Sequence, residues 1–326
     1  MTELHSRPGR AVRRAVAAAL TMAVALGVGT GAGPALARGL GLGASGTGGR
    51  LVGAGLVAVV AVLPVLYALR RFGLPPARAG FGGAGASVRA LLTGVGVTGG
   101  AAALVLGLGT AAGMLRWTRP DLGTLAWFLV TNSVIALLLE ALPEETTLRG
   151  FAWSSLRASF GGGIAALGTT AVFLLVPGTS TVVGAGAARL VGDSDGPRIG
   201  LVPEGQHPAD YLVLLTIFGL TLVAARTALR HAPLWTAIGT HLTFLTVNRI
   251  ALEGEQRGAG WSATDLSPEV PLLVPVYLLL AAAVFLVLGR RTRRADATVA
   301  ANANANANAN ANATASRATA QPWLRV

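Results

Sequence analysis

Apolar residues in this chain are grouped in long blocks and do not follow the period of an amphipathic helix or strand. A block of roughly 20 apolar residues is long enough for an α-helix to cross the hydrocarbon core of a bilayer. Eight such blocks are present, at Ala15–Pro34, Leu51–Leu69, Ala90–Leu115, Leu122–Leu142, Ile164–Val183, Tyr211–Leu229, Leu234–Asn248 and Val270–Leu288. The pattern predicts an all-α fold: a polytopic transmembrane helical bundle with about eight transmembrane helices.

The segments around these blocks divide the chain into three regions. Residues 1–37 are an N-terminal span or a signal-like segment, because a basic start and an apolar stretch precede the small residues Ala35-Leu36-Ala37. Residues 38–294 form the membrane domain. Residues 295–326 begin with Ala-Asn repeats and continue as a polar tail, which has no apolar face to bury. We therefore expect this tail to be disordered and cytoplasmic.

The arginines predict the orientation in the membrane. All 26 basic residues are arginines; 18 of them lie in segments on the same side as the N-terminus, and 8 lie on the opposite side. Cytoplasmic loops carry the excess of basic residues. The count predicts a multi-pass protein of the cell (plasma) membrane with both termini in the cytoplasm, and it places residues 192–205 outside.

The composition excludes several other classes of protein. Hydrophobic residues make up 52% of the chain and charged residues 12%, which is too little charge to cover a soluble protein of this length. The net charge is +12, and the basic residues lie mainly between the apolar blocks and form no basic face interleaved with aromatics. We therefore expect the lipid bilayer as a partner and no nucleic acid. The absence of cysteine excludes disulfides, thiol catalysis and thiolate metal sites.

Ionisable residues at membrane depth are costly and therefore informative. The densest group follows the fourth block, in the sequence EALPEETTLRGF, which begins at Glu140. Glu145 and Arg149 are four residues apart, which is the spacing of a helical ion pair. Glu144 points about 100° away on the same helix. An unpaired carboxylate in apolar surroundings can deprotonate water, although a charged helix end at the headgroups is an equal alternative.

A histidine provides the second polar feature. His241 lies inside the seventh block, where a histidine either bonds a neighbouring helix or acts as a ligand or base. Asn248 follows seven residues later and shares its helical face, about 10.5 Å along the axis. Packing is the more common role for a single buried histidine.

Together these residues resemble a known family. Glu144-Glu145-x-x-x-Arg149-Gly150 is similar to the EExxxRG signature of the CAAX-protease and bacteriocin-processing (CPBP) family of intramembrane metalloproteases, which includes CAAX prenyl endopeptidases. The resemblance implies an eight-helix membrane domain with a peptide or protein substrate in the membrane. It implies Glu144 as the water activator, Glu145 as its partner, Arg149 as the orienting cation and His241 as the second catalytic-site residue.

The chain also departs from the family pattern. Leu234-Trp235 before His241 resembles a later family motif, but the residue four after His241 is Leu245, where the family has Asn or Asp. The family's Phe-x-x-x-His motif has its best match at Phe173, with Pro177 in place of the histidine. Phe173 and Asn248 are therefore only accessory candidates.

These departures leave the metal and the activity open. Glu144 and His241 are the candidate ligands for zinc or another divalent metal, but a catalytic zinc usually has three protein ligands, so the site looks incomplete. An intramembrane endopeptidase that cuts near the cytoplasmic face is the preferred interpretation. A catalytically inactive family member that acts as a peptide-binding or immunity-type membrane protein is the alternative. A transporter with a proton path through Glu140, Glu144 and His241 has less support.

Overall fold

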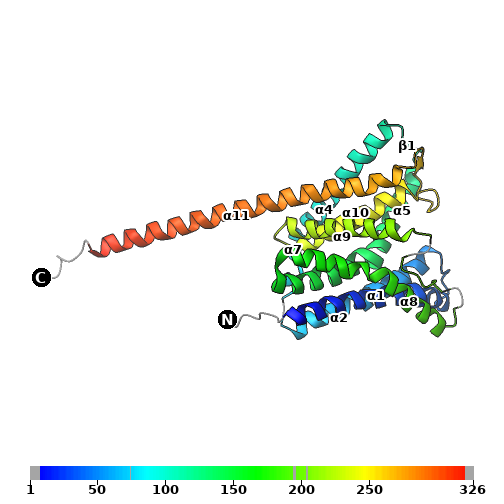
Figure 1. Cartoon of the computed structure of the whole chain (residues 1–326), viewed down its shortest axis with the longest axis horizontal. Coiled ribbons are helices and arrows are strands. Elements are labelled where there is room, and N and C mark those ends of the chain that lie inside the picture. Colours follow the sequence, from blue (N-terminus) through cyan, green and yellow to red (C-terminus); the bar gives the residue numbers. More distant parts are fainter. Residues whose placement is uncertain (1–7, 74, 194–195, 203–204, 320–326) are drawn as a thin grey trace.

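The computed structural model describes residues 8–73, 75–193, 196–202 and 205–319. It is a bundle of long helices (Figure 1). The helices are α1 (Pro8–Gly39), α2 (Thr47–Arg71), α3 (Pro76–Ala79), α4 (Ala84–Ala111), α5 (Leu122–Ala136), α6 (Leu142–Glu144), α7 (Trp153–Leu174), α8 (Val176–Leu190), α9 (Pro208–Ala228), α10 (Pro233–Ala251) and α11 (Leu273–Thr319). Leu137–Ala141 and Glu145–Ala152 are π-helical, Val270–Leu272 is a 3₁₀ turn, and the two short strands are β1 (Leu115–Trp117) and β2 (Ala263–Asp265).

The predicted class, a helical membrane bundle, is confirmed. Among the described residues, six helical stretches are long and apolar enough to cross a membrane. They are Pro8–Gly39, Thr47–Arg71, Pro76–Ala111, Leu122–Leu190, Pro208–Ala228 and Val270–Ala295. The exact number of eight is not confirmed, and the division into domains stays a prediction.

The stretch Leu122–Leu190 folds back on itself. Gly161 has φ 77° and ψ 179°, a conformation that ends a helix and that glycine adopts without strain. After it, a Cβ placed on Gly168 would lie 3.1 Å from Leu156 Cδ1, although residues twelve apart in a straight helix are about 18 Å apart. The chain therefore crosses the bundle towards Gly161 and returns through α7 and α8.

The predicted end of the fourth block at Leu142 is wrong. The helix that begins at Leu122 continues through Glu144 and Glu145 to the turn at Gly161, so the glutamates lie in its middle and not at its end. Pro143 has no N–H and should interrupt the hydrogen-bond ladder. The π-helical turns on both sides adjust the pairing locally, which is how membrane helices tolerate proline.

Contacts between connecting segments agree with the predicted topology. β1 pairs antiparallel with β2, Arg38 Nη2 lies 2.7 Å from Asp193 Oδ2, and Leu234 N donates to Gly80 O at 3.1 Å. Each of these contacts joins two connecting segments that the arginine count places on the same side of the membrane. The contacts do not identify the cytoplasmic side, which stays a prediction together with the plasma-membrane location.

The C-terminal region differs from the expected disordered tail. α11 continues as one helix through the Ala-Asn repeats to Thr319, and Figure 1 shows its later part extending away from the bundle. Alanine has the highest helix propensity, so every second residue of the repeat favours this conformation. Residues 320–326 of the predicted tail lie outside the described residues.

Glycines allow the helices to approach closely. A Cβ on Gly94 of α4 would lie 2.2 Å from Thr236 O of α10, and a Cβ on Gly239 of α10 would lie 2.3 Å from Leu91 O. A Cβ on Gly31 of α1 would similarly lie 2.2 Å from Gly184 O of α8. Such small-residue contacts are typical of membrane helices, where association depends on close packing.

We predict that Gly94→Ala lowers the free energy of unfolding by about 1–3 kcal/mol, because the added methyl group meets fixed backbone and forces α4 away from α10. Thermal unfolding of the purified protein in detergent measures the change. Gly96→Ala is the matched control, because a Cβ there meets no atom within 4 Å. It should be neutral or stabilising by up to about 1 kcal/mol. Equal stability of the two variants would contradict the packing argument.

Candidate active site

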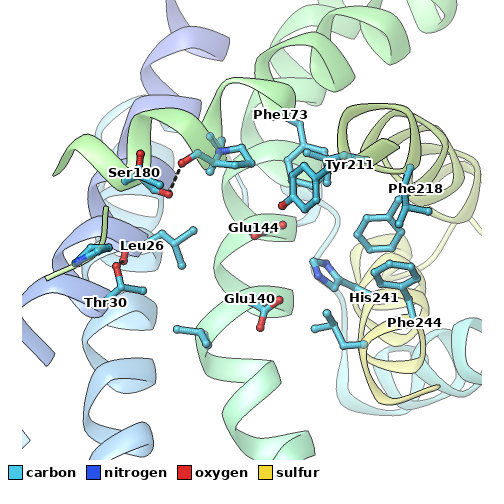
Figure 2. A pocket seen from close by; sticks show the side chains of 18 of the residues that line it. Leu26, Thr30, Glu140, Glu144, Phe173, Ser180, Tyr211, Phe218, His241 and Phe244 are labelled. Atoms are coloured by element: carbon cyan, nitrogen blue, oxygen red, sulfur yellow. Dashed lines mark hydrogen bonds between the residues drawn. The ribbon is translucent and has the colours of Figure 1, made fainter. Parts of the chain in front are cut away.

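A cavity of about 480 Å³ lies among α1, α8, α9, α10 and the long helix that carries the glutamates. Figure 2 shows Glu140 and Glu144 projecting into it from one helix, with His241, Phe218 and Phe244 on the other side. The cavity wall is mainly apolar. It consists of Leu26, Thr30, Leu139, Glu140, Glu144, Phe173, Val176, Pro177, Ser180, Thr181, Pro197, Arg198, Tyr211, Leu214, Leu215, Phe218, His241, Phe244 and Leu245.

A buried charge network lies beside this cavity. Glu145 Oε1 is 3.4 Å from Arg149 Nη1 and 3.0 Å from His241 Nδ1. The side chains of Glu145 and Arg149 are fully buried, and His241 is 2% exposed. The predicted Glu145–Arg149 ion pair is therefore present. It also fixes the ring of His241 on a different helix.

Aromatic rings enclose the network. The Arg149 guanidinium lies 4.3 Å from the centroid of the Phe173 ring, within range of a cation–π interaction. Phe218 meets the His241 ring edge-on at 4.9 Å and stacks on Phe244 at 4.1 Å. These contacts exclude water from one side of the charges and hold the imidazole in a single orientation.

Glu144 differs from Glu145 in its surroundings. It is 8% exposed and lines the cavity, and its carboxylate has no ion-pair or hydrogen-bond partner among the residues that the structure describes. The orientation of Glu144 away from the Glu145–Arg149 pair matches the helical geometry expected from the sequence. The site thus contains one carboxylate held by charges and one that faces open space.

The structure brings most of the predicted residues together, but not Asn248. Glu144, Phe173 and His241 line the cavity, and Glu145 and Arg149 lie directly behind it. Asn248 does not line the cavity, because its Oδ1 accepts a hydrogen bond from the Tyr277 hydroxyl of α11 at 3.1 Å. The two turns that separate it from His241 place it beyond the cavity.

The two departures from the family pattern face the same cavity. Pro177 and Leu245 both line it, at positions where the family has polar side chains. The helix breaks at Leu175, between α7 and α8, next to the proline. The alignment of Phe173 and Pro177 with the family motif is therefore spatially consistent, and the cavity is more apolar than the family pattern implies.

Sequence reasoning missed Tyr211, and it named Glu140 only for the less supported transporter. The hydroxyl of Tyr211, in the first turn of α9, is directed towards Glu144 in Figure 2. Glu140 pairs with Arg249 Nη2, and Arg249 Nη1 donates to Asn132 Oδ1 at 3.1 Å. Glu140 was visible as a carboxylate one turn before Glu144. The sequence contains no signal that places Tyr211 in this cavity, because its position depends on the packing of α9.

The donor set does not fit a three-ligand metal site. In the described ranges, no three His, Asp or Glu side chains come close enough together to hold a metal ion. Of the two candidate ligands, Glu144 faces the cavity, while His241 uses Nδ1 for Glu145. A catalytic zinc usually has three protein ligands, and the other carboxylate in the cavity wall, that of Glu140, is paired with Arg249.

The cavity reaches one end of the bundle. Pro197 and Arg198, from the connection between α8 and α9, form part of its wall. Thr30, in the C-terminal half of α1, and Tyr211, in the first turn of α9, line it as well. The arginine count places this connection outside. The expectation of access from the cytoplasmic face therefore conflicts with the predicted orientation, because the glutamates lie in mid-helix and the cavity extends towards the other end.

Comparison with known proteins supports the family. Residues 125–247 match a family model described as Type II CAAX prenyl endopeptidase Rce1-like. The match contains Glu144, Glu145, Arg149 and His241, and it supports the resemblance of this part of the chain to the CPBP family of CAAX-type membrane proteases. No curated protein and no solved structure gives a significant match.

We predict that Arg149→Met lowers the free energy of unfolding by about 3–5 kcal/mol, because it leaves the Glu145 carboxylate buried with only a histidine to compensate it. The double variant Glu145→Gln/Arg149→Met should recover most of this loss, since it removes both charges. Thermal unfolding of the wild type, Glu145→Gln, Arg149→Met and the double variant completes the double-mutant cycle. A double variant no more stable than Arg149→Met would show that the buried ion pair is not the source of the effect.

Proposed function

We propose that this protein is an intramembrane endopeptidase in which Glu144 activates a water molecule for attack on a peptide bond. The family match over residues 125–247 supports a CAAX-type protease, and this proposal adds the residues and their roles. The observation that carries it is the unpaired carboxylate of Glu144, which faces the cavity opposite a histidine held by Glu145.

The proposed chemistry begins with proton transfer to Glu144. Its carboxylate accepts a proton from water as the oxygen attacks the scissile carbonyl, and returns that proton to the leaving amine. Glu145 carries the compensating charge of Arg149, so it accepts the His241 Nδ1–H and not a proton from water. The other ring nitrogen of His241, Nε2, is then available to form a hydrogen bond with the substrate or with water in the cavity.

The developing oxyanion requires a hydrogen-bond donor. Most hydroxyl groups in the cavity wall already donate to the backbone. Thr30 Oγ1 donates to Leu26 O at 2.8 Å, Ser180 Oγ donates to Pro177 O at 2.7 Å, and Thr181 Oγ1 lies 2.8 Å from Gly178 O. Their protons are committed to the backbone. The Tyr211 hydroxyl, in contrast, has no hydrogen bond to the backbone in the described part of the chain, and it is directed towards Glu144 in Figure 2.

We therefore assign Tyr211 as the proposed oxyanion donor. Its O–H compensates for the polar side chains that the family has at the positions of Pro177 and Leu245. A preorganised donor in a site without bulk water stabilises a developing negative charge strongly. The substrate is a peptide segment that reaches the cavity from the end of the bundle formed by the α8–α9 connection.

A second candidate function is peptide binding without cleavage. The specific observation in its favour is that Pro177 and Leu245 line the cavity where the family has polar residues. An apolar cavity of this size can hold a side chain or a short peptide segment without any chemistry. The two variants described next distinguish a protease from a protein that only binds peptides.

We predict that Glu144→Gln lowers kcat by at least about 10²-fold, because it removes the base and keeps the side-chain volume. Protein reconstituted in liposomes is assayed against a library of membrane-anchored peptides that includes prenylated CAAX peptides. Glu253→Gln, at the exposed pair with Arg257, is the control and should retain activity. Cleavage by Glu144→Gln at the wild-type rate would end the assignment, and absence of cleavage by the wild type with retained peptide binding would favour the second function.

We predict that Tyr211→Phe lowers kcat by about 10²–10³-fold and leaves KM nearly unchanged, because the lost hydrogen bond forms only as the oxyanion develops. Thr30→Val is the matched control, since it removes a cavity hydroxyl whose proton is already donated to the backbone. If both variants keep wild-type kcat while Glu144→Gln is inactive, the oxyanion role of Tyr211 is wrong and the role of Glu144 stands.

A further inference from the structure

A second cavity lies on the opposite face of α9. It has a volume of about 430 Å³ and is bounded by α9, α11 and the parts of α7 on both sides of Gly161. Its walls are mostly apolar. They consist of Trp153, Arg157, Gly162, Ala166, Ile217, Leu220, Thr221, Val223, Ala224, Thr227, Leu279, Ala282, Leu286 and Arg293. We call this cavity the α7–α9–α11 groove.

The groove carries positive charge at one end. Arg157 and Arg293 line it, and no acidic side chain does. The Arg157 guanidinium lies 4.7 Å from the centroid of the Trp153 ring, which keeps it at the groove wall. Tryptophan and arginine at the end of an apolar surface are typical of the level of lipid headgroups.

The two arginines lie at the same level of the bundle. Thr292 Oγ1 of α11 donates to Ala228 O of α9 at 3.2 Å, so Arg293 lies level with the C-terminal end of α9. Arg157 precedes the turn at Gly161, and Arg157 and the nearby Arg226 both lie over the ring of Trp153. The charged end of the groove therefore faces the membrane surface that the arginine count assigns to the cytoplasm.

The apolar part has the length of one lipid leaflet. Along α9 the groove extends from Thr227 to Ile217, which is about 15 Å at the rise of an α-helix. Half of a hydrocarbon core of about 30 Å is the same length. Leu220, Leu279 and Leu286 in the wall are partly exposed at the surface of the bundle, so an acyl chain can enter from the bilayer.

We propose that the α7–α9–α11 groove binds one anionic phospholipid, with its phosphate at Arg157 and Arg293 and an acyl chain along α9. Charge complementarity selects an anionic headgroup, because both groups at the charged end are guanidiniums, which bind phosphate in bidentate fashion. Basic pockets between membrane helices on the cytoplasmic side are known to bind such headgroups. The proposal is independent of proteolysis, since this groove and the glutamate cavity lie on different faces of α9.

The experiment uses the purified full chain in zwitterionic detergent, titrated with phosphatidylglycerol, phosphatidylcholine or inorganic phosphate and followed by native mass spectrometry and thermal unfolding. We expect phosphatidylglycerol to be retained and to raise the Tm more than phosphatidylcholine. Arg157→Gln/Arg293→Gln should weaken its binding about 25-fold, because each arginine near an anionic lipid contributes roughly fivefold. Arg290→Gln/Arg291→Gln is the matched control, since it removes the same charge from α11 outside the groove.

A separate variant tests the apolar half of the site. Ala282→Phe adds a ring within the groove and should displace the acyl chain, lowering phosphatidylglycerol retention without a change of charge. If the double variants Arg157→Gln/Arg293→Gln and Arg290→Gln/Arg291→Gln lose phosphatidylglycerol binding equally, the proposal is overturned in favour of diffuse surface charge. Equal effects of inorganic phosphate and phosphatidylglycerol would overturn it in favour of a simple anion site, and equal retention of both lipids would remove the role of the arginines.

Discussion

The fully buried carboxylate of Glu145 is the constraint on which the centre of this structure depends. A charge in the middle of a membrane bundle is stable only when its partners are fixed in place, and here they are Arg149 on the same helix and His241 on α10. The contact between Glu145 and His241 joins two helices that are far apart in the sequence. It also determines the orientation of the imidazole, since Nδ1 is engaged by the carboxylate.

The backbone around this pair is adapted to its position. π-helical turns before and after Leu142–Glu144 allow one continuous helix to include Pro143 and to present Glu144 to the cavity and Glu145 to its partners. Such turns occur often at functional sites, because the wider turn changes the direction of consecutive side chains. Close contacts at Gly94 and Gly239 hold α10 near α4 and therefore help to fix the height of His241.

The cavity follows from what this network leaves open. Glu144 is directed away from the charges that satisfy Glu145, while Pro177 and Leu245 make the facing wall apolar. The same helix, α9, contributes Tyr211 and Phe218 to this cavity and Leu220 and Thr227 to the lipid-facing groove behind it. One helix thus separates the glutamate-containing cavity inside the bundle from the proposed lipid-binding groove.

The sequence by itself determined the membrane class and the helical content, because apolar block length is a local property. It singled out Glu144, Glu145, Arg149 and His241 through their resemblance to family motifs, and their catalytic roles stay a prediction. It placed the end of the fourth helix too early, since proline normally ends a helix and the compensating π turns have no sequence signal. It also grouped Asn248 with His241 from helical periodicity, whereas its partner is Tyr277 on α11. The tertiary structure alone decided that Tyr211 faces Glu144 and that Glu140 pairs with Arg249, because those contacts depend on how helices distant in the sequence pack together.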